Sequence, residues 1–219
     1  MEPNPFLWAP ERAARQESDA ILRALVQGVP YGCIRTDVRP DGVPQRYEVL
    51  ARRQTVGRYA AERPMRGLRM GTDERSGRVW VSVHADPRLI LWAMSARSRM
   101  ALLDERLYRG MLHELTHVLD PAVAEGRVRG VDPEHDIVRY YNALPEYRAY
   151  SADLARAVLA EARLDHEPVS FEQILRWMQA VFARDPGVEE WWRFALPSHR
   201  RRFLRDVAIA LTQARAEDG

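Results

Sequence analysis

The stretch His113-Glu114-Leu115-Thr116-His117 decides the fold, because it reads H-E-x-x-H inside a segment with helical periodicity. Residues four positions apart lie on one face of an α-helix, so the imidazoles of His113 and His117 can reach the same metal ion. The carboxylate of Glu114 can reach a water molecule on that ion. The pattern therefore predicts a catalytic zinc site on a helix. The alternative is an ordinary helix with two structural histidines and a surface glutamate.

The residues around this stretch predict that the helix covers about 104–120. Its apolar stripe consists of Leu107, Met111, Leu112, Leu115, Val118 and Leu119. Asp120-Pro121 ends the helix, because the residue before a proline disfavours helical geometry.

Length, composition and charge limit the class of protein. A chain of 219 residues, 46% hydrophobic and 29% charged, is typical of one globular domain with a helical extension. The net charge of +2 gives no strong preference for nucleic acid or an anionic membrane. The single cysteine, Cys33, excludes an intramolecular disulfide bond and a zinc site built from thiolates. The longest apolar run, 89–94, is too short to span a membrane, and residues 1–10 lack a secretory signal. We therefore expect a cytoplasmic location, with signal-free export as the alternative.

The segments before the motif predict a helix followed by a small sheet within about 31–85. Periodicity and turn residues predict a helix over 10–27, strands over 31–38, 46–53 and 78–85, and a turn over 39–42. Residues 54–77 are rich in Arg and Gly and lack periodicity, which predicts a loop with a possible short strand at 55–59. A helical pattern then starts at Pro87, with Asp86 as its cap and a break near 95–99.

The segments after the motif are predicted to be helical. Residues 121–141 are expected to form a connection, followed by helices over 145–164, from a Ser170 cap, over 188–195 and over 198–216. Ser170 and Gln173 have the spacing of a capping box.

A catalytic zinc site needs a third protein ligand. The candidates are His84, Asp120, His135, Glu146, Asp153, Asp165, His166, Glu167 and His199. Asp120 is disfavoured, because seven residues of helix rise by about 10 Å and a short side chain cannot span that distance to meet His113. Glu146 is favoured, because it begins the next helix and the small Ala149, one turn later, allows a close approach. The alternative is a surface glutamate.

Two acidic residues are candidates for contact with the ligands instead of the metal. Asp153 lies on the same face as Glu146, where it can accept a proton from the outer nitrogen of a liganding histidine. The alternative for Asp153 is an ordinary ion pair with Arg156. Asp120, at the helix end, is a second candidate for such a contact.

His113-Glu114-Leu115-Thr116-His117, followed by Glu146 and Ala149, resembles the gluzincin pattern of zinc metallopeptidases, H-E-x-x-H and then E-x-x-A on a second helix. The stretch 140–150 also resembles compact zincin-like proteins of bacteria and their phages. The resemblance implies an α+β, zincin-like fold, in which a small twisted sheet packs on the active-site helix and a further helix carries the third ligand. It implies a metallopeptidase domain over 1–167 and a C-terminal helical extension over 168–219. The strand 79–83 would then be the edge strand over the cleft, or alternatively part of the sheet core.

The expected function is zinc-dependent hydrolysis of peptide bonds in a peptide or protein substrate. His113, His117 and Glu146 would hold Zn²⁺, and Glu114 would act as general base. Candidates for the group that stabilises the oxyanion are Tyr140, Tyr141, Tyr147, His135 and Arg148. The alternatives are a zincin-fold binding or regulatory module with little hydrolysis, and a protease or effector that acts on one partner protein. The basic run 199–202 is interpreted as a solvated helix start and not as a nucleic-acid site. The pattern does not indicate the oligomeric state.

Overall fold

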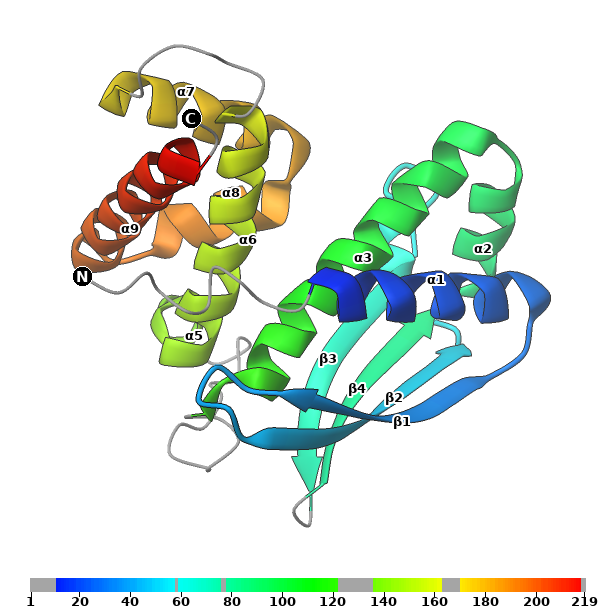
Figure 1. The fold of residues 1–219 in the computed structure, drawn as a ribbon. Helices are drawn as coiled ribbons and strands as arrows, with labels where there is room; N and C mark the ends of the chain where they lie inside the picture. Colours follow the sequence, from blue (N-terminus) through cyan, green and yellow to red (C-terminus); the bar gives the residue numbers. More distant parts are fainter. Residues whose placement is uncertain (1–10, 58, 76–77, 122–135, 163–169, 218–219) are drawn as a thin grey trace. The chain divides into compact units, whose positions relative to one another are not determined.

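The computed structural model describes residues 11–57, 59–75, 78–121, 136–162 and 170–217, which form an α+β chain (Figure 1). A four-stranded sheet lies in the N-terminal part, and the remainder is mostly helical. The described residues divide into two compact units, here called the sheet unit (residues 11–121) and the helical unit (residues 136–217). Among the described helices, none has the length and apolar character needed to cross a bilayer.

The sheet unit contains a sheet and three main helices. Its elements are α1 (Glu11–Gln27), β1 (Tyr31–Val38), β2 (Pro44–Arg53), η2 (Pro64–Gly67), β3 (Leu68–Arg75), β4 (Arg78–Ala85), α2 (Pro87–Met94) and α3 (Arg97–Leu119). Helices α1 and α3 pack on one face of the sheet (Figure 1). The buried centre of this unit includes Val49 and Val81 of the strands and Leu107, Met111 and Leu115 of α3.

The predicted hairpin is confirmed. Strand β1 pairs antiparallel with β2, with Tyr31 opposite Ala51. In the turn between them, the Gly42 amide donates a hydrogen bond to the Arg39 carbonyl oxygen at 2.8 Å. Gly42 has a φ of 81°, a left-handed conformation that glycine adopts without steric cost.

Strand β3 corrects the prediction of a loop over 54–77. Residues 68–75 form a strand that pairs antiparallel with β4, whereas none of the described residues within 55–59 belongs to a strand. No described side chain of β3 is fully buried, so the run lacks the apolar alternation from which strands are predicted.

The order of the strands, β1-β2-β4-β3, corrects the prediction of an edge strand at 79–83. Strand β4 is internal, since it pairs parallel with β2 and antiparallel with β3. Its alternating Val79, Val81 and Val83 are buried against the helices. The expectation that this strand belongs to the sheet core is therefore confirmed, and the two edge strands are β1 and β3.

The helices before and around the motif follow the prediction closely. Asp86 caps α2 by accepting a hydrogen bond from the Arg88 amide at 2.9 Å, and the break falls at residues 95–96. Helix α3 begins at Arg97, earlier than the predicted residue 104, and ends at Leu119 as expected before Asp120-Pro121.

The helical unit consists of five helices among the described residues. They are α5 (Ile137–Asn142), α6 (Leu144–Ala162), α7 (Phe171–Arg184), α8 (Pro186–Phe194) and α9 (Pro197–Glu217). Helix α5 corrects the predicted connection over 137–141, and residues 122–135 of that connection lie outside the described residues. The predicted capping box of Ser170 and Gln173 is confirmed.

One core joins α6 to the C-terminal helices. Tyr147 and Leu154 of α6 belong to the same buried cluster as Trp177, Trp191 and Phe203. The helices over 170–217, which belong to the predicted C-terminal extension over 168–219, therefore pack on α6, and the boundary itself stays a prediction.

Candidate metal centre

The two motif histidines lie one turn apart on α3, as the sequence predicts. Their Nε2 atoms are 3.2 Å apart. The ring planes are nearly perpendicular, at 82°, with centroids 4.8 Å apart. The two nitrogens therefore converge on one point beside the helix.

This separation fits a shared zinc ion. Two nitrogen ligands of a tetrahedral zinc, each about 2.0–2.1 Å from the metal, lie about 3.3 Å apart. The observed distance of 3.2 Å between the His113 and His117 nitrogens is within the scatter of that value. At this distance one imidazole can also donate a hydrogen bond to the other.

Glu114 is the buried acidic residue of the motif, with 8% of its surface exposed. Its Oε2 accepts a hydrogen bond from the hydroxyl of Thr72 at 2.9 Å. The same hydroxyl lies 3.3 Å from the backbone oxygen of Glu114. The side chain next to the first histidine is therefore connected to strand β3.

The side chain of Met70 on β3 lies against α3 at Gly110, one turn before the motif. A Cβ atom at this position would lie 2.3 Å from the sulfur of Met70 on β3. Because Gly110 has no side chain, Met70 can lie directly against the helix. Two positions further along β3, Thr72 reaches Glu114.

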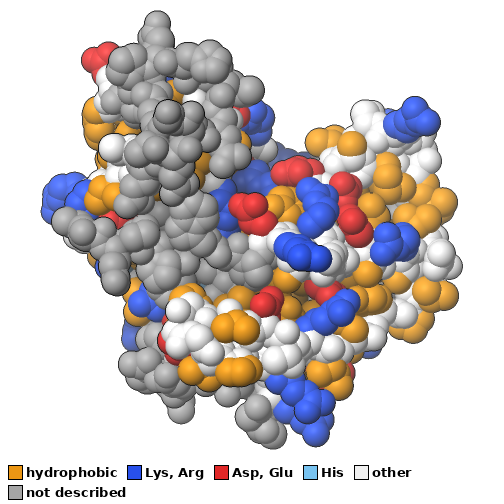
Figure 2. All heavy atoms as spheres, viewed as in Figure 1, with side chains coloured by type: hydrophobic (Ala, Val, Ile, Leu, Met, Phe, Trp, Pro, Cys, Tyr) orange, Lys and Arg blue, Asp and Glu red, His pale blue; other side chains and the backbone are white. Residues whose placement is uncertain are grey.

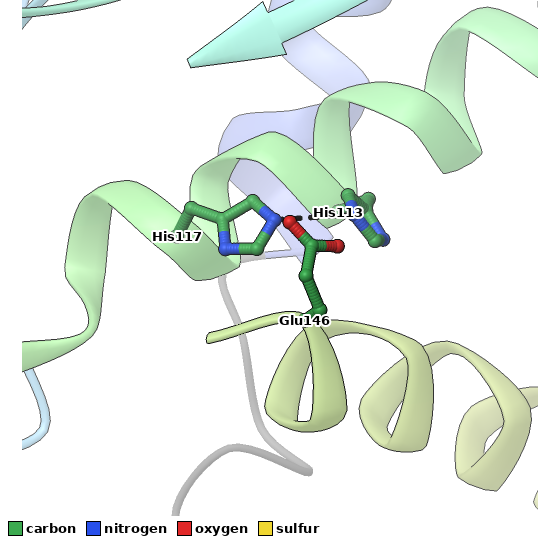
Figure 3. A group of neighbouring side chains, drawn as sticks. All are labelled: His113, His117 and Glu146. Atoms are coloured by element: carbon green, nitrogen blue, oxygen red, sulfur yellow. Dashed lines mark hydrogen bonds between the residues drawn. The ribbon is translucent and has the colours of Figure 1, made fainter. Parts of the chain in front are cut away.

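Glu146 lies in the first turn of α6. Figure 3 draws this side chain together with those of His113 and His117, which the sequence analysis named with it as the three candidate ligands. The histidines belong to the sheet unit and Glu146 to the helical unit.

The remaining histidine candidates have other hydrogen-bonding neighbours. Nδ1 of His84 on β4 accepts a long hydrogen bond of 3.5 Å from Arg52, and Nδ1 of His199 lies 3.0 Å from Oδ1 of Asn142. Burial, with Arg52 as a second cause, lowers the pKa of His84. The candidates His135, Asp165, His166 and Glu167 lie outside the described residues.

The two acids predicted to contact the ligands have different surroundings. Asp120 is 1% exposed and ends α3, with its amide donating to the His117 carbonyl oxygen at 3.2 Å. Asp153 forms an ion pair with Arg156 at 3.3 Å, as the alternative interpretation expected. A contact of either acid with a metal ligand stays a prediction.

The described candidates for oxyanion stabilisation lie on α5 and α6, and His135 lies outside the described residues. Tyr141 and Tyr147 belong to the core of the helical unit, and burial raises the pKa of each to about 12. The Tyr147 ring lies against His199, with centroids 4.3 Å apart. Tyr140 and Arg148 are partly exposed. None of these described contacts distinguishes one candidate as the group that stabilises the oxyanion.

Thr72 is a residue that the sequence analysis did not identify, because residues 54–77 were interpreted as a loop. The feature that identifies Thr72 is the register of β3. In this register Thr72 lies opposite the buried Val81, so its side chain points toward α3. That register follows only once β3 is recognised as the partner of β4.

The surface of the sheet unit is mixed in charge. On the face shown in Figure 2, arginine and acidic side chains lie next to one another with hydrophobic side chains between them. Arg15 of α1 and Asp104 of α3, for example, form an ion pair at 3.2 Å. Comparisons of the chain with protein-family models, with curated proteins and with solved structures gave no match, so the expected family rests on the residues themselves.

Proposed function

We propose that the chain is a zinc-dependent metallopeptidase with a gluzincin-type site on a zincin-like fold. The observation that carries this proposal is the 3.2 Å separation of the His113 and His117 nitrogens, beside the buried carboxylate of Glu114. Motif, helix and nitrogen geometry agree with a catalytic zinc site.

The proposed ligands are His113, His117 and Glu146. Two imidazoles and one carboxylate form a donor set found in catalytic zinc sites, with the fourth position left for water or substrate. A zinc ion held by these side chains would supply Lewis-acid chemistry and a water molecule with a pKa lowered to about 7.

Glu114 is the proposed general base. Its Oε1 atom would receive a proton from the attacking water and later deliver it to the leaving amine. The low exposure of this carboxylate strengthens its electrostatic interactions, because little bulk water screens it.

An extended peptide is the proposed substrate. Strand β3 is one of the two edge strands of the sheet, and it contacts α3 through Met70 and Thr72. An edge strand can bind an extended peptide through backbone hydrogen bonds. This edge lies beside the Glu114 carboxylate, so a peptide paired with it would be brought near the general base.

The test is hydrolysis by the variant Glu114→Gln. We expect a loss of turnover on unfolded protein or a peptide library by about 10²–10⁴-fold, because general-base catalysis is removed. Zinc content should stay at the wild-type level. The matched control is Glu105→Gln, the same change at an exposed position of α3, which should retain activity.

Retained turnover in Glu114→Gln would disprove the proposed mechanism. A wild type that binds zinc but cleaves nothing would instead favour the binding-module alternative.

A further inference from the structure

We infer that Thr72, on edge strand β3, is a positioning residue that fixes the catalytic orientation of Glu114 through a side-chain hydrogen bond. This inference rests on the proposed function. It adds a residue outside the H-E-x-x-H motif, which the motif itself does not specify. It also gives the edge strand a role in catalysis in addition to any role in peptide binding.

The contact is specific. The Thr72 hydroxyl donates to Glu114 Oε2 at 2.9 Å, a normal length for a hydrogen bond to a carboxylate. Among the residues that the structure describes, Thr72 is the one hydrogen-bond partner of this carboxylate. Within this described part of the chain, one side chain therefore holds the Glu114 carboxylate by a hydrogen bond.

The two carboxylate oxygens of Glu114 have different roles: Oε2 accepts the hydrogen bond from Thr72, and Oε1 is left for the reaction. A hydroxyl has one proton to donate, and the shorter distance assigns it to Oε2 and not to the backbone oxygen 3.3 Å away. Oε1 is then available to accept a proton from water. A glutamate loses much rotamer freedom when it is ordered, so a contact that orders it before the substrate binds reduces the cost of reaching the reactive geometry.

The fold also determines where the donor, the Thr72 hydroxyl, lies. Thr72 lies opposite Val81 in the register of β3 and β4, so its side chain faces α3. Threonine is stiff at χ1 because it is branched at Cβ. The close packing of Met70 on Gly110 keeps β3 against the helix two residues earlier.

The first test compares Thr72→Val, which removes the hydroxyl but keeps the shape, with Thr72→Ser, which keeps the hydroxyl. We expect Thr72→Val to lower kcat by about 10–100-fold, the usual effect of losing such a supporting contact. KM and zinc content should change little, since the substitution keeps the backbone of the peptide-binding edge and leaves the metal ligands unaltered. Thr72→Ser should restore most of kcat.

The matched control is Ser82→Ala on the neighbouring strand. The Ser82 hydroxyl donates to the Gly71 carbonyl oxygen at 3.2 Å, and its side chain is on the opposite face of the sheet from Thr72. Its removal should leave kcat unchanged. Equal kcat in wild type and Thr72→Val would overturn the inference, as would a Thr72→Ser variant no better than Thr72→Val.

The second test does not depend on activity. In zinc-free protein, Thr72→Val should lower the urea midpoint in the wild-type background but much less in a Glu114→Ala background, where the bond is already lost. Equal shifts in both backgrounds would show that the two side chains do not interact, and would overturn the inference without affecting the proposed function. If the urea experiment shows that Thr72 and Glu114 interact but the protein hydrolyses no peptide, the proposed function and the catalytic role of Thr72 are both overturned. The hydrogen bond between the two side chains would still stand.

Discussion

Glu114 illustrates how a carboxylate can be kept nearly buried beside two imidazoles. Removing a charge from water is costly unless hydrogen bonds or opposite charges replace the lost solvation. The hydroxyl of Thr72 supplies one hydrogen bond, and a metal ion on the neighbouring histidines would supply the opposite charge. Together these two contributions would compensate for the burial of this carboxylate.

Individual site residues could be predicted from the sequence when their partners lie on the same helix. His113, Glu114 and His117 are related by helical periodicity alone, so their common face follows from spacing. Thr72 could not be predicted, because its contact with Glu114 spans 42 positions in the sequence. That contact depends on the strand register, which local periodicity does not specify.

Tyr147 provides a test that separates a core role from a catalytic one. Its hydroxyl oxygen is buried and has no hydrogen-bond partner among the described residues. Tyr147→Phe should therefore raise the free energy of unfolding by about 1 kcal/mol, because an unsatisfied polar group is removed. It should also leave kcat unchanged. Urea unfolding and steady-state kinetics measure both.

The matched control is Tyr31→Phe in the sheet unit. The Tyr31 hydroxyl donates to Glu17 Oε2 at 2.7 Å, and Glu17 is only 2% exposed. Its loss should lower stability by about 1–3 kcal/mol, because a buried carboxylate loses a partner. A large loss of kcat in Tyr147→Phe would show that Tyr147 takes part in the reaction.

At the scale of elements, caps and turns were predicted well because they are local. The Asp86 cap, the turn at 39–42 and the capping box at Ser170 each depend on a few neighbouring residues. Strand β3 was missed because an edge strand with half-buried side chains shows little alternation. Its partner β4 was recognised from three buried valines, but its internal position depends on non-local pairing.

Asp86 connects the start of α2 to the loop that follows β2. Its carboxylate accepts hydrogen bonds from the Arg88 and Val56 amides at 2.9 and 3.1 Å, and it pairs with the Arg88 guanidinium. Asp86→Ala should lower the free energy of unfolding by about 2 kcal/mol, since both a cap and a buried contact are lost. Urea unfolding at neutral pH measures this.

The effect of Asp86 should depend on pH. Hydrogen bonds from the Arg88 side chain hold the pKa of this carboxyl well below its usual range. A lowered pKa in the folded state contributes stability above the unfolded value of about 3.9, and this contribution is lost as the pH falls toward the folded value. The stability difference between wild type and Asp86→Ala should therefore shrink between about pH 6 and pH 2. A control, Glu62→Ala at an exposed position, should show no such trend. A difference that is constant over this range would contradict the assignment.

For the whole molecule, the sequence predicted the order of elements better than their grouping. Periodicity shows which face of α6 is apolar, but not which helices cover that face. The cluster around Trp191, which is fully buried, places α6 with the C-terminal helices. Trp191 also donates a hydrogen bond to the Tyr141 carbonyl oxygen at 3.2 Å, which joins α8 to α5. The proposed third ligand thus belongs to a different compact unit from the histidines.

The most direct test of the central claim is the zinc content of purified chains. We expect about one zinc ion per wild-type chain, bound by three protein ligands. His113→Ala, His117→Ala and Glu146→Ala should each lose most of it after mild chelation, while Asp120→Ala should retain it. Loss of zinc in Asp120→Ala with full retention in Glu146→Ala would contradict the proposed site.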